Sequence, residues 1–324
     1  MARLPGTIGR SLLLARLFPA GMAILLATAL PALAQSTAKP TATRAATSAT
    51  VVAPIPAPGP APGPVRIVGG PGPGCIAGAQ RLPDAAPGLQ TVRPGRSSFW
   101  GHPDVVAALL LLGQRARAAG LPDLYMNDIS NPRGGPMPGG HASHQVGLDA
   151  DVYLDIAIPR VVLTADQRER MEPPGLVRPD QRGVDPRHWR PGHVTLLRLA
   201  TELPGVDRVL VNAAIKKQLC TEVPAGQRAW LQRIRPWYAH AAHMHIRFRC
   251  PAGQPECADL RPLPPGDGCD ASLQWWFDRL DQPPPQPTPR PQGEPRVPAA
   301  CAAIMTMPAV IPAAMTAPAR PPPR

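Results

Sequence analysis

Proline is unevenly distributed along this chain of 324 residues, and its distribution limits where a folded domain can form. Residues 35–74 and 282–324 are dominated by Pro together with Ala, Thr and Gly, a composition that buries too little apolar surface to offset the ordering of the backbone. The intervening segment, 75–281, has the size of one ordinary domain and shows no internal repeat. We therefore expect one folded domain at 75–281, between a linker at 35–74 and a Pro-rich tail at 282–324.

The first 34 residues have the pattern of a secretory signal peptide. Arg3, Arg10 and Arg16 lie ahead of or within a run that ends with the apolar residues 21–30, and the segment ends with small residues at Ala32 and Ala34. The run is shorter than a stable membrane anchor requires, so we expect cleavage after Ala34, with an uncleaved anchor as the alternative. No later segment offers roughly twenty consecutive apolar residues. The mature chain is therefore expected to have no membrane span.

The cysteines favour an oxidising compartment, because all of them follow the signal and their number is even. They are Cys75, Cys220, Cys250, Cys257, Cys269 and Cys301. Thiolate zinc sites are the alternative, but the chain has no close Cys-x-x-Cys pair. Three disulfides are therefore expected. Their spacing does not define the pairing, although it favours a local bridge between Cys250 and Cys257.

The chain carries a formal net charge of +12, and removal of the three signal arginines leaves 12 − 3 = +9. Such a charge favours anionic partners such as nucleic acid, a membrane surface or the cell wall. No basic cluster is interleaved with aromatic residues in the manner of proteins that stack on bases. We therefore expect no nucleic-acid binding.

Two segments alternate strictly between polar and apolar residues, which indicates strands. In 148–156 the polar positions are Asp149, Asp151, Tyr153 and Asp155, and in 243–250 they are His243, His245, Arg247 and Arg249. We expect 148–156 to have one buried face and one face that presents carboxylates. Further strands are expected at 121–130 and 207–211, and helices at 103–119, 165–171, 191–203, 213–219, 226–234 and 272–280. Because strands and helices do not alternate regularly, the pattern predicts an α+β domain with a central antiparallel sheet and flanking helices.

Histidines gather at these two predicted strands. Five of the eight lie at 141–144 or 240–245, whereas a lone histidine is usually a hydrogen-bonded core or surface residue. Residues two apart on a strand share a face, and a turn at Gly147 can return His144 toward Asp151. Imidazole and carboxylate are typical zinc ligands, and a catalytic zinc keeps one position for water. The pattern predicts a zinc cleft on one face of the sheet and a metallopeptidase activity.

Residues 139–151 and 235–251 resemble the penicillin-insensitive murein endopeptidases, within the wider group of lysostaphin-type endopeptidases, D-Ala-D-Ala metallopeptidases and hedgehog domains. The likeness extends to 99–104, 211–220 and 264–269 and covers about Cys75 to Trp276. It implies the zinc ligands His144, Asp151 and His245. It also implies that His243 acts as the base or stabilises the oxyanion, that His240 is an accessory catalytic residue, and that Asp149 serves hydrogen bonding or structure. The implied disulfides are Cys75–Cys301, which would tether the tail, Cys220–Cys269 and Cys250–Cys257.

Members of this family can carry a second metal site, built from the first histidine of His-x-x-His and a later Asp-x-x-His. Here these positions are His141 and Asp180, but Gly183 stands where the last histidine is expected. His188 or Asp185 could substitute for it. His141 could instead only line the cleft.

The same resemblance implies a periplasmic enzyme with Zn2+ as cofactor and peptidoglycan as partner. Its substrate would be the cross-link between D-alanine and meso-diaminopimelate, with links between two diaminopimelates as a further target. Since no serine nucleophile is needed, β-lactams would not inhibit it. Arg235, Arg247 and Arg249 are candidates for binding substrate carboxylates, although they could equally be structural. A D-Ala-D-Ala carboxypeptidase and a non-catalytic peptidoglycan-binding protein are the alternatives, and the presence of both His243 and His245 argues against the latter.

Overall fold

The computed structural model describes residues 50–52, 58–137, 141–157, 161–282 and 296–309. The predicted signal at 1–34 and its cleavage site lie outside these residues. Among the helices of the described residues, none combines the length and the hydropathy needed to cross a membrane.

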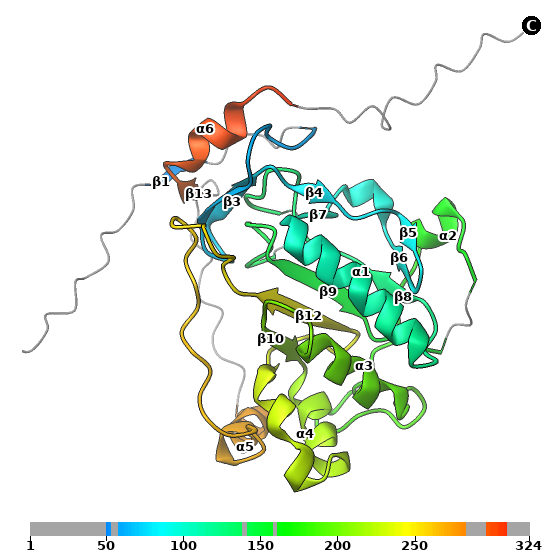
Figure 1. Ribbon diagram of the computed structural model, residues 1–324. Coiled ribbons are helices and arrows are strands. Elements are labelled where there is room, and N and C mark those ends of the chain that lie inside the picture. The colour runs from blue at the N-terminus through cyan, green and yellow to red at the C-terminus, as the bar shows by residue number, and fades with distance from the viewer. Residues whose placement is uncertain (1–49, 53–57, 138–140, 158–160, 283–295, 310–324) are drawn as a thin grey trace, which may run out of the picture. The chain divides into compact units, whose positions relative to one another are not determined.

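A seven-stranded mixed sheet forms the centre of the fold, in the order β11-β10-β12-β9-β8-β6-β5 (Figure 1). The strands are β5 (Ala85–Ala86), β6 (Leu89–Thr91), β8 (Leu124–Met126), β9 (Asp149–Tyr153), β10 (Val206–Val211), β11 (Ile234–Pro236) and β12 (His243–Phe248). The pairings β10–β12, β12–β9, β9–β8 and β5–β6 are antiparallel, while β10–β11 and β6–β8 are parallel. The predicted α+β class with a central antiparallel sheet is confirmed, with parallel pairs added toward both edges.

Helices pack around the sheets and bury apolar residues. They are α1 (Pro103–Ala118), α2 (Ala165–Glu169), α3 (Gly192–Thr201), α4 (Ala213–Glu222), α5 (Ala271–Asp278) and α6 (Cys301–Thr306). The α1 helix begins with Pro103 at a position that needs no backbone donor, and the ring of His102 accepts a hydrogen bond from the Asp104 amide. It lies in front of β8 and β9 in Figure 1. Its apolar residues share one core with Val152 of β9 and Ile246 of β12.

Two predicted elements differ from the structure. The helix expected at 226–234 is replaced by two 3-10 helices, Ala225–Gln227 and Ala229–Arg233. Pro224 and Gly226 disfavour an α-helix there, and β11 begins directly afterwards, so too few residues remain for one. The strand expected at 121–130 ends at Met126, because the backbone amides at 129 and 130 donate to the Ser98 carbonyl instead. The remaining 3-10 helices are Pro94–Arg96 and Arg279–Asp281.

A second, smaller core lies beside the main one and uses residues from both Pro-rich segments. The strand β1 (Thr50–Val52) pairs with β13 (Arg296–Pro298), and β2 (Arg66–Gly69) pairs with β3 (Gly74–Ala77). The remaining two-stranded sheet joins β4 (Gln80–Arg81) to β7 (Trp100–Gly101). The buried residues of the small core are Ala61, Val68, Cys75, Ala77, Val297, Cys301, Ile304 and Met305. Folded structure therefore extends past 75–281 on both sides, because these scattered apolar residues gather around one disulfide.

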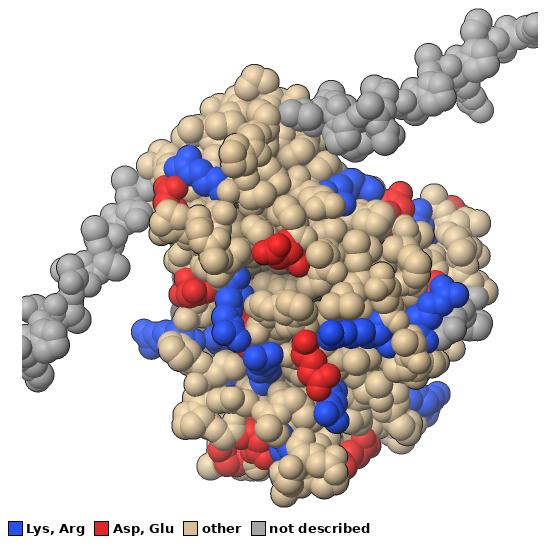
Figure 2. Space-filling view, viewed as in Figure 1, with Lys and Arg blue, Asp and Glu red and all other residues tan. Residues whose placement is uncertain are grey.

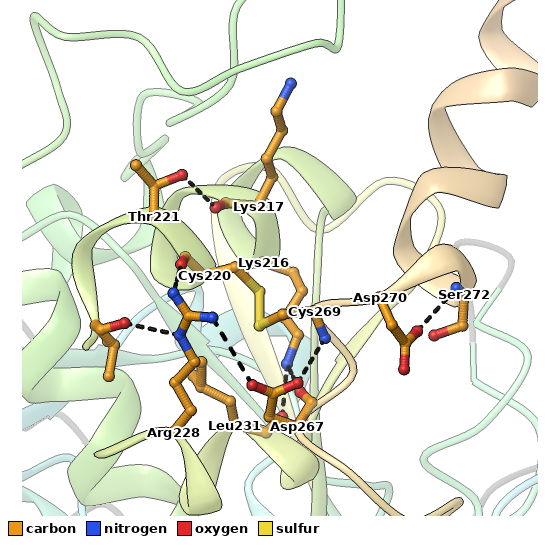
Figure 3. The surroundings of a disulfide bond; sticks show 11 residues. Lys216, Lys217, Cys220, Thr221, Arg228, Leu231, Asp267, Cys269, Asp270 and Ser272 are labelled. Carbon is orange, nitrogen blue, oxygen red and sulfur yellow. Dashed lines mark hydrogen bonds and ion pairs between the residues drawn. A yellow bond between two sulfur atoms is a disulfide. The ribbon is translucent and has the colours of Figure 1, made fainter. Parts of the chain in front are cut away.

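The three disulfides implied by the resemblance are confirmed. They are Cys75–Cys301, Cys220–Cys269 and Cys250–Cys257, and no free cysteine remains. Figure 3 shows Cys220–Cys269, which joins α4 to the segment before α5. Beside it the fully buried Lys216 donates from Nζ to the carbonyls of Leu231 (2.6 Å) and Asp267 (2.5 Å). Covalent and polar contacts thus hold the 267–269 loop against α4.

Charge is dispersed on the face of the molecule in Figure 2, where Lys and Arg are interspersed with Asp and Glu on a largely uncharged surface. A protein that binds nucleic acid through its phosphates presents a continuous basic surface instead. The face shown has no such continuous surface.

Candidate active site

A cleft of about 790 Å³ contains the predicted histidines and one of the predicted aspartates. The chemically active residues that line it are Asn127, His141, His144, Asp151, Arg208, Arg235, Trp237, Tyr238, His240, His243, His245, Arg247 and Trp276. They come from four strands (β9, β10, β11 and β12), from α5 and from loops that are far apart in sequence. The cleft therefore brings together the two histidine-rich segments that the sequence singled out.

The pairing of β9 with β12 places the acids opposite the histidines. In this antiparallel pair His245 faces Asp151 and Arg247 faces Asp149. The carboxylate face of β9 is buried, however, and not exposed as the alternation suggested: Asp149 is 0% and Asp151 4% exposed. The reason is that β9 lies inside the sheet and that the loop carrying His144 covers its polar face. Both carboxylates are thus removed from bulk water.

The loop before β9 returns His144 to the strand, as predicted. Gly147 has a positive φ of 68°, and His144 itself is left-handed with φ 67°. The His144 amide donates to Asp149 Oδ2 (2.9 Å), and its ring Nδ1 lies 2.9 Å from the Ile129 carbonyl oxygen. The other ring nitrogen, Nε2, lies 3.4 Å from Asp151 Oδ2. These contacts thus stabilise the left-handed backbone of His144 and direct its ring toward Asp151.

His245 is held in a similar way from the other side. Its Nε2 lies 3.0 Å from Asp149 Oδ1, and its Nδ1 lies 3.1 Å from Asp151 Oδ1. Asp149 also accepts a hydrogen bond from Arg247 Nε at 2.6 Å. Burial alone would raise the pKa of Asp149, but His245 and Arg247 outweigh it and hold that pKa well below its ordinary value. Asp149 therefore remains charged and fixes the ring of His245.

Asp151 carries an unsatisfied polar atom at the centre of this arrangement. Its Oδ1 is buried and accepts no hydrogen bond within the described structure, although His245 Nδ1 is near. The rings of His144 and His245 have centroids 4.6 Å apart. Burial opposes a charge on His144, yet the Asp151 carboxylate outweighs it and raises the pKa of His144 to about 9. Two imidazoles and a buried carboxylate oxygen without a donor form a donor set that suits a cation such as zinc.

His141 also approaches this centre. Among the described residues, His141, His144 and Asp151 present ligand atoms that all lie within 4.8 Å of one another, a group that does not include His245. His141 Nε2 lies 3.5 Å from Asp128 Oδ2. The buried Asp128 is already bound by three other donors, from Arg96, Ser98 and Asn127. His141 therefore lies beside the predicted zinc ligands His144 and Asp151 and not in a separate second site.

The other residues considered for a second site lie apart from His141. Asp180 is exposed in a turn, where it pairs with Arg178 (3.3 Å) and accepts from the Arg182 amide. Asp185 pairs with Arg187 at 2.6 Å. Neither acid belongs to the group of close ligand atoms around His141. The geometry thus joins His141 to the first centre.

The two predicted catalytic histidines lie at the mouth of the cleft. His243 Nε2 is 3.7 Å from Asp151 Oδ2, and its side chain is 29% exposed. The ring of His240 lies 4.8 Å from that of His243, and its Nδ1 is 2.6 Å from the Tyr238 carbonyl. Burial is the main cause that lowers the pKa of His243. Burial also lowers the pKa of His240, to about 4, with His243 contributing. Both rings are therefore neutral near pH 7, and His243 can accept a proton.

An aromatic wall completes the cleft and was not indicated by the sequence pattern. Trp237 and Tyr238 are half exposed, and the ring of Trp276 from α5 lies 4.8 Å from Tyr238. The only local signal is the adjacent Trp-Tyr pair just before His240. In the sequence, Trp276 has the pattern of a core residue of the helix predicted at 272–280. Its approach to the cleft results from the tertiary packing of α5, which a local pattern does not reveal.

Comparison with known proteins identifies the family of this chain. The family model of the penicillin-insensitive murein endopeptidases matches residues 67–306. A penicillin-insensitive murein endopeptidase of Klebsiella pneumoniae is 42% identical over 235 residues, which cover 72% of this chain and 83% of the relative. Proteins of the same name from Haemophilus influenzae (41% over 242 residues, 72% and 80%) and Escherichia coli (40% over 235 residues, 72% and 83%) are similarly close. The chain therefore belongs to the family of penicillin-insensitive murein endopeptidases and is a peptidase.

Proposed function

We propose that this murein endopeptidase is zinc-dependent and cleaves the cross-links between D-alanine and meso-diaminopimelate in peptidoglycan. The observation that carries the proposal is the buried Asp151 carboxylate. Its Oδ1 accepts no hydrogen bond from a described residue and lies 3.1 Å from His245 Nδ1, while its Oδ2 lies 3.4 Å from His144 Nε2. The proposed ligands are these three residues. The disulfides support export to an oxidising compartment, and we propose the periplasm.

The contacts of the ring nitrogens that would face away from the zinc favour His245 over His141 as the third ligand. A zinc-binding histidine usually donates its other ring N–H to a carboxylate or a carbonyl. His144 has the Ile129 carbonyl in that position, and His245 has Asp149. The carboxylate behind His141 already has three donors. Zinc content of the His141→Ala and His245→Ala variants separates the two sets, because only loss of a ligand abolishes binding.

When bound, zinc acidifies a water molecule and polarises a substrate carbonyl. The protein's own residues complete the chemistry. His243, neutral and beside Asp151, takes the proton of the attacking water and afterwards donates it to the leaving amine. His240 packs against His243 and is held by the Tyr238 carbonyl, so it keeps that ring in place.

The division between ligands and base predicts the behaviour of His243→Ala. Because His243 is not a proposed ligand, this variant should keep one zinc per chain while its hydrolysis rate falls by roughly 10²–10⁴-fold. Metal content is measured by elemental mass spectrometry, and turnover by chromatography of muropeptides released from purified sacculi. Asp151→Ala is the comparison, since it should lose the metal. A His243→Ala protein that fails to bind zinc would contradict this assignment.

A carboxypeptidase would use the same ligands but would trim stem peptides. The same chromatography distinguishes the two activities, because an endopeptidase removes dimeric muropeptides whereas a carboxypeptidase only shortens monomers. We expect loss of dimers, also in the presence of a β-lactam. Sacculi that carry links between two diaminopimelates test the broader specificity.

A further inference from the structure

One arginine lies in the same row of paired residues across the sheet as the proposed zinc ligands His245 and Asp151. Arg235 of β11 pairs with Leu210 of β10, Leu210 pairs with His245 of β12, and His245 pairs with Asp151 of β9. Paired residues on adjacent strands project from the same face. Two strand spacings, roughly 10 Å, separate the main chain at Arg235 from that at His245. In this row Leu210 is the residue between Arg235 and His245, and all three residues line the same cleft.

Arg235 differs from the other arginines in and near this cleft by having no partner. Arg247 is bound to Asp149, Arg208 to Asp207 and to the Arg261 carbonyl, and Arg249 to the Val206 carbonyl. No hydrogen bond or ion pair joins the Arg235 guanidinium to any described residue. Burial lowers its pKa, as does the neighbouring Arg208, while Asp270 acts in the opposite direction. An arginine stays charged even so, which leaves an uncompensated, half-buried cation in the cleft.

The surroundings of Arg235 keep its side chain in place. Gly268 lies against the guanidinium, where an added Cβ would come within 3.0 Å of Arg235 Nη1. The loop that carries Gly268 is fixed on both sides, by the Cys220–Cys269 disulfide and by the hydrogen bond from Lys216 to the Asp267 carbonyl (Figure 3). The missing side chain at 268 thus leaves room for the arginine, and the fixed loop limits its movement. A charge held in this way is organised before a ligand arrives.

The proposed substrate carries an anion directly beside its scissile bond. In the cross-link, the carbon that carries the scissile amide nitrogen on the diaminopimelate side also carries a carboxylate. A guanidinium binds a carboxylate through two parallel hydrogen bonds. We propose that Arg235 binds this carboxylate and thereby selects cross-links whose amine side is an amino acid with a free carboxyl group. This inference rests on the proposed endopeptidase function.

The test uses two synthetic cross-linked peptides that differ at one group, the carboxylate beside the scissile amide or the corresponding carboxamide. With the full-length protein, kcat and KM are measured for the wild type, Arg235→Gln, Arg235→Lys and a control, Arg198→Gln. Arg198 lies on α3, pairs with Glu202 and does not line the cleft, so the control removes one positive charge elsewhere. Thermal unfolding and zinc content establish that each variant is folded and loaded.

We expect the wild type and Arg198→Gln to prefer the carboxylate by roughly 10–100-fold in kcat/KM, the size of one charge-assisted hydrogen-bond pair. Arg235→Gln should lose this preference mainly through KM, and Arg235→Lys should retain part of it. Calorimetric binding of both peptides to His243→Ala, with and without Arg235→Gln, should show the same difference in Kd.

Two results would overturn the inference alone. The wild type could cleave both peptides equally well, or Arg235→Gln could keep the full preference for the carboxylate. Cleavage of neither peptide by the zinc-loaded wild type would instead refute the proposed function, and the inference with it.

Discussion

At the scale of single residues, Asp149 connects more parts of the site than any proposed ligand. Its carboxylate accepts from the His144 amide and from Arg247, and it faces His245. It therefore ties the loop before β9 to β12. The alternation places Asp149 on the same strand face as Asp151 and does not distinguish the two acids, whereas their contacts in the structure do.

Replacement of Asp149 with Asn should weaken zinc binding without removing a ligand. The amide cannot balance the charge of Arg247, and it no longer holds the His245 ring as a carboxylate does, so we expect the zinc Kd to rise by roughly 10–100-fold. The affinity is measured by competition with a chromophoric chelator. Asp155→Asn is the control, since Asp155 follows the same strand and, within the described part of the chain, its carboxylate accepts a hydrogen bond from the Ala157 amide. Equal zinc affinity in Asp149→Asn and the control would argue against this role.

At the scale of elements, local patterns predicted the strands that carry the site and the long helix that covers them. The alternation at 148–156 and 243–250 gave β9 and β12, and the Pro103 and Gly120 signals gave α1. Patterns of a few residues do not carry information about distant partners. For this reason the burial of both faces of β9, the parallel edge pairs and the approach of Trp276 to the cleft could not be predicted. The cluster of His141 with His144 and Asp151 likewise depends on how a Gly-rich loop folds.

The helix α4 carries a buried lysine whose titration should be visible in the stability of the protein. Burial, together with the nearby Arg235 cation, lowers the pKa of Lys216 from 10.5 to about 7. Between these two values the unfolded chain holds a proton that the folded protein has released, so stability should increase as the pH rises from about 7 toward 10. The amine costs the folded state most below pH 7, where it must be charged while buried.

Urea unfolding of the wild type and of Lys216→Met across this pH range tests the expectation. The difference in unfolding free energy should change in favour of the wild type by up to about 1.4 kcal/mol per pH unit. Lys217→Met is a matched control, because Lys217 is the adjacent residue on the same helix and is exposed. Parallel pH profiles for the wild type and Lys216→Met would show that the amine titrates at its ordinary pKa.

At the scale of the whole molecule, the small core formed by both Pro-rich segments contacts the chain that leads to the loop before β9, which carries His144. The buried Arg133 donates to the carbonyls of Gly59, Ile304 and Met305, which belong to these segments. The next residue, Gly134, bridges to Cys75 and packs so closely on the Gln145 carbonyl that a Cβ would lie 2.0 Å from its oxygen. Arg133 and Gly134, and through Gly134 the backbone at Gln145, are thus anchored to chain regions that the proline content alone marks as unable to fold.

Removal of the Cys75–Cys301 bridge should therefore affect both stability and the site. For Cys75→Ser with Cys301→Ser we expect a loss of about 2–5 kcal/mol in the free energy of unfolding and a weaker affinity for zinc. Urea unfolding and chelator competition measure the two effects. Cys250→Ser with Cys257→Ser is the control: it opens a loop with a sequence separation of 7 instead of 226 and should leave zinc affinity unchanged. Wild-type zinc affinity without Cys75–Cys301 would show that the small core does not support the loop.

The Cys75–Cys301 bridge also has a consequence for biogenesis. Among the six cysteines Cys75 comes first along the chain and Cys301 last, so during synthesis the partner of Cys75 appears after the four other thiols. An oxidant that joins thiols in their order of appearance would link Cys75 to Cys220. Native pairing consequently requires that Cys75 stay reduced until the segment with Cys301 is available, or that thiol–disulfide exchange correct an early wrong pair.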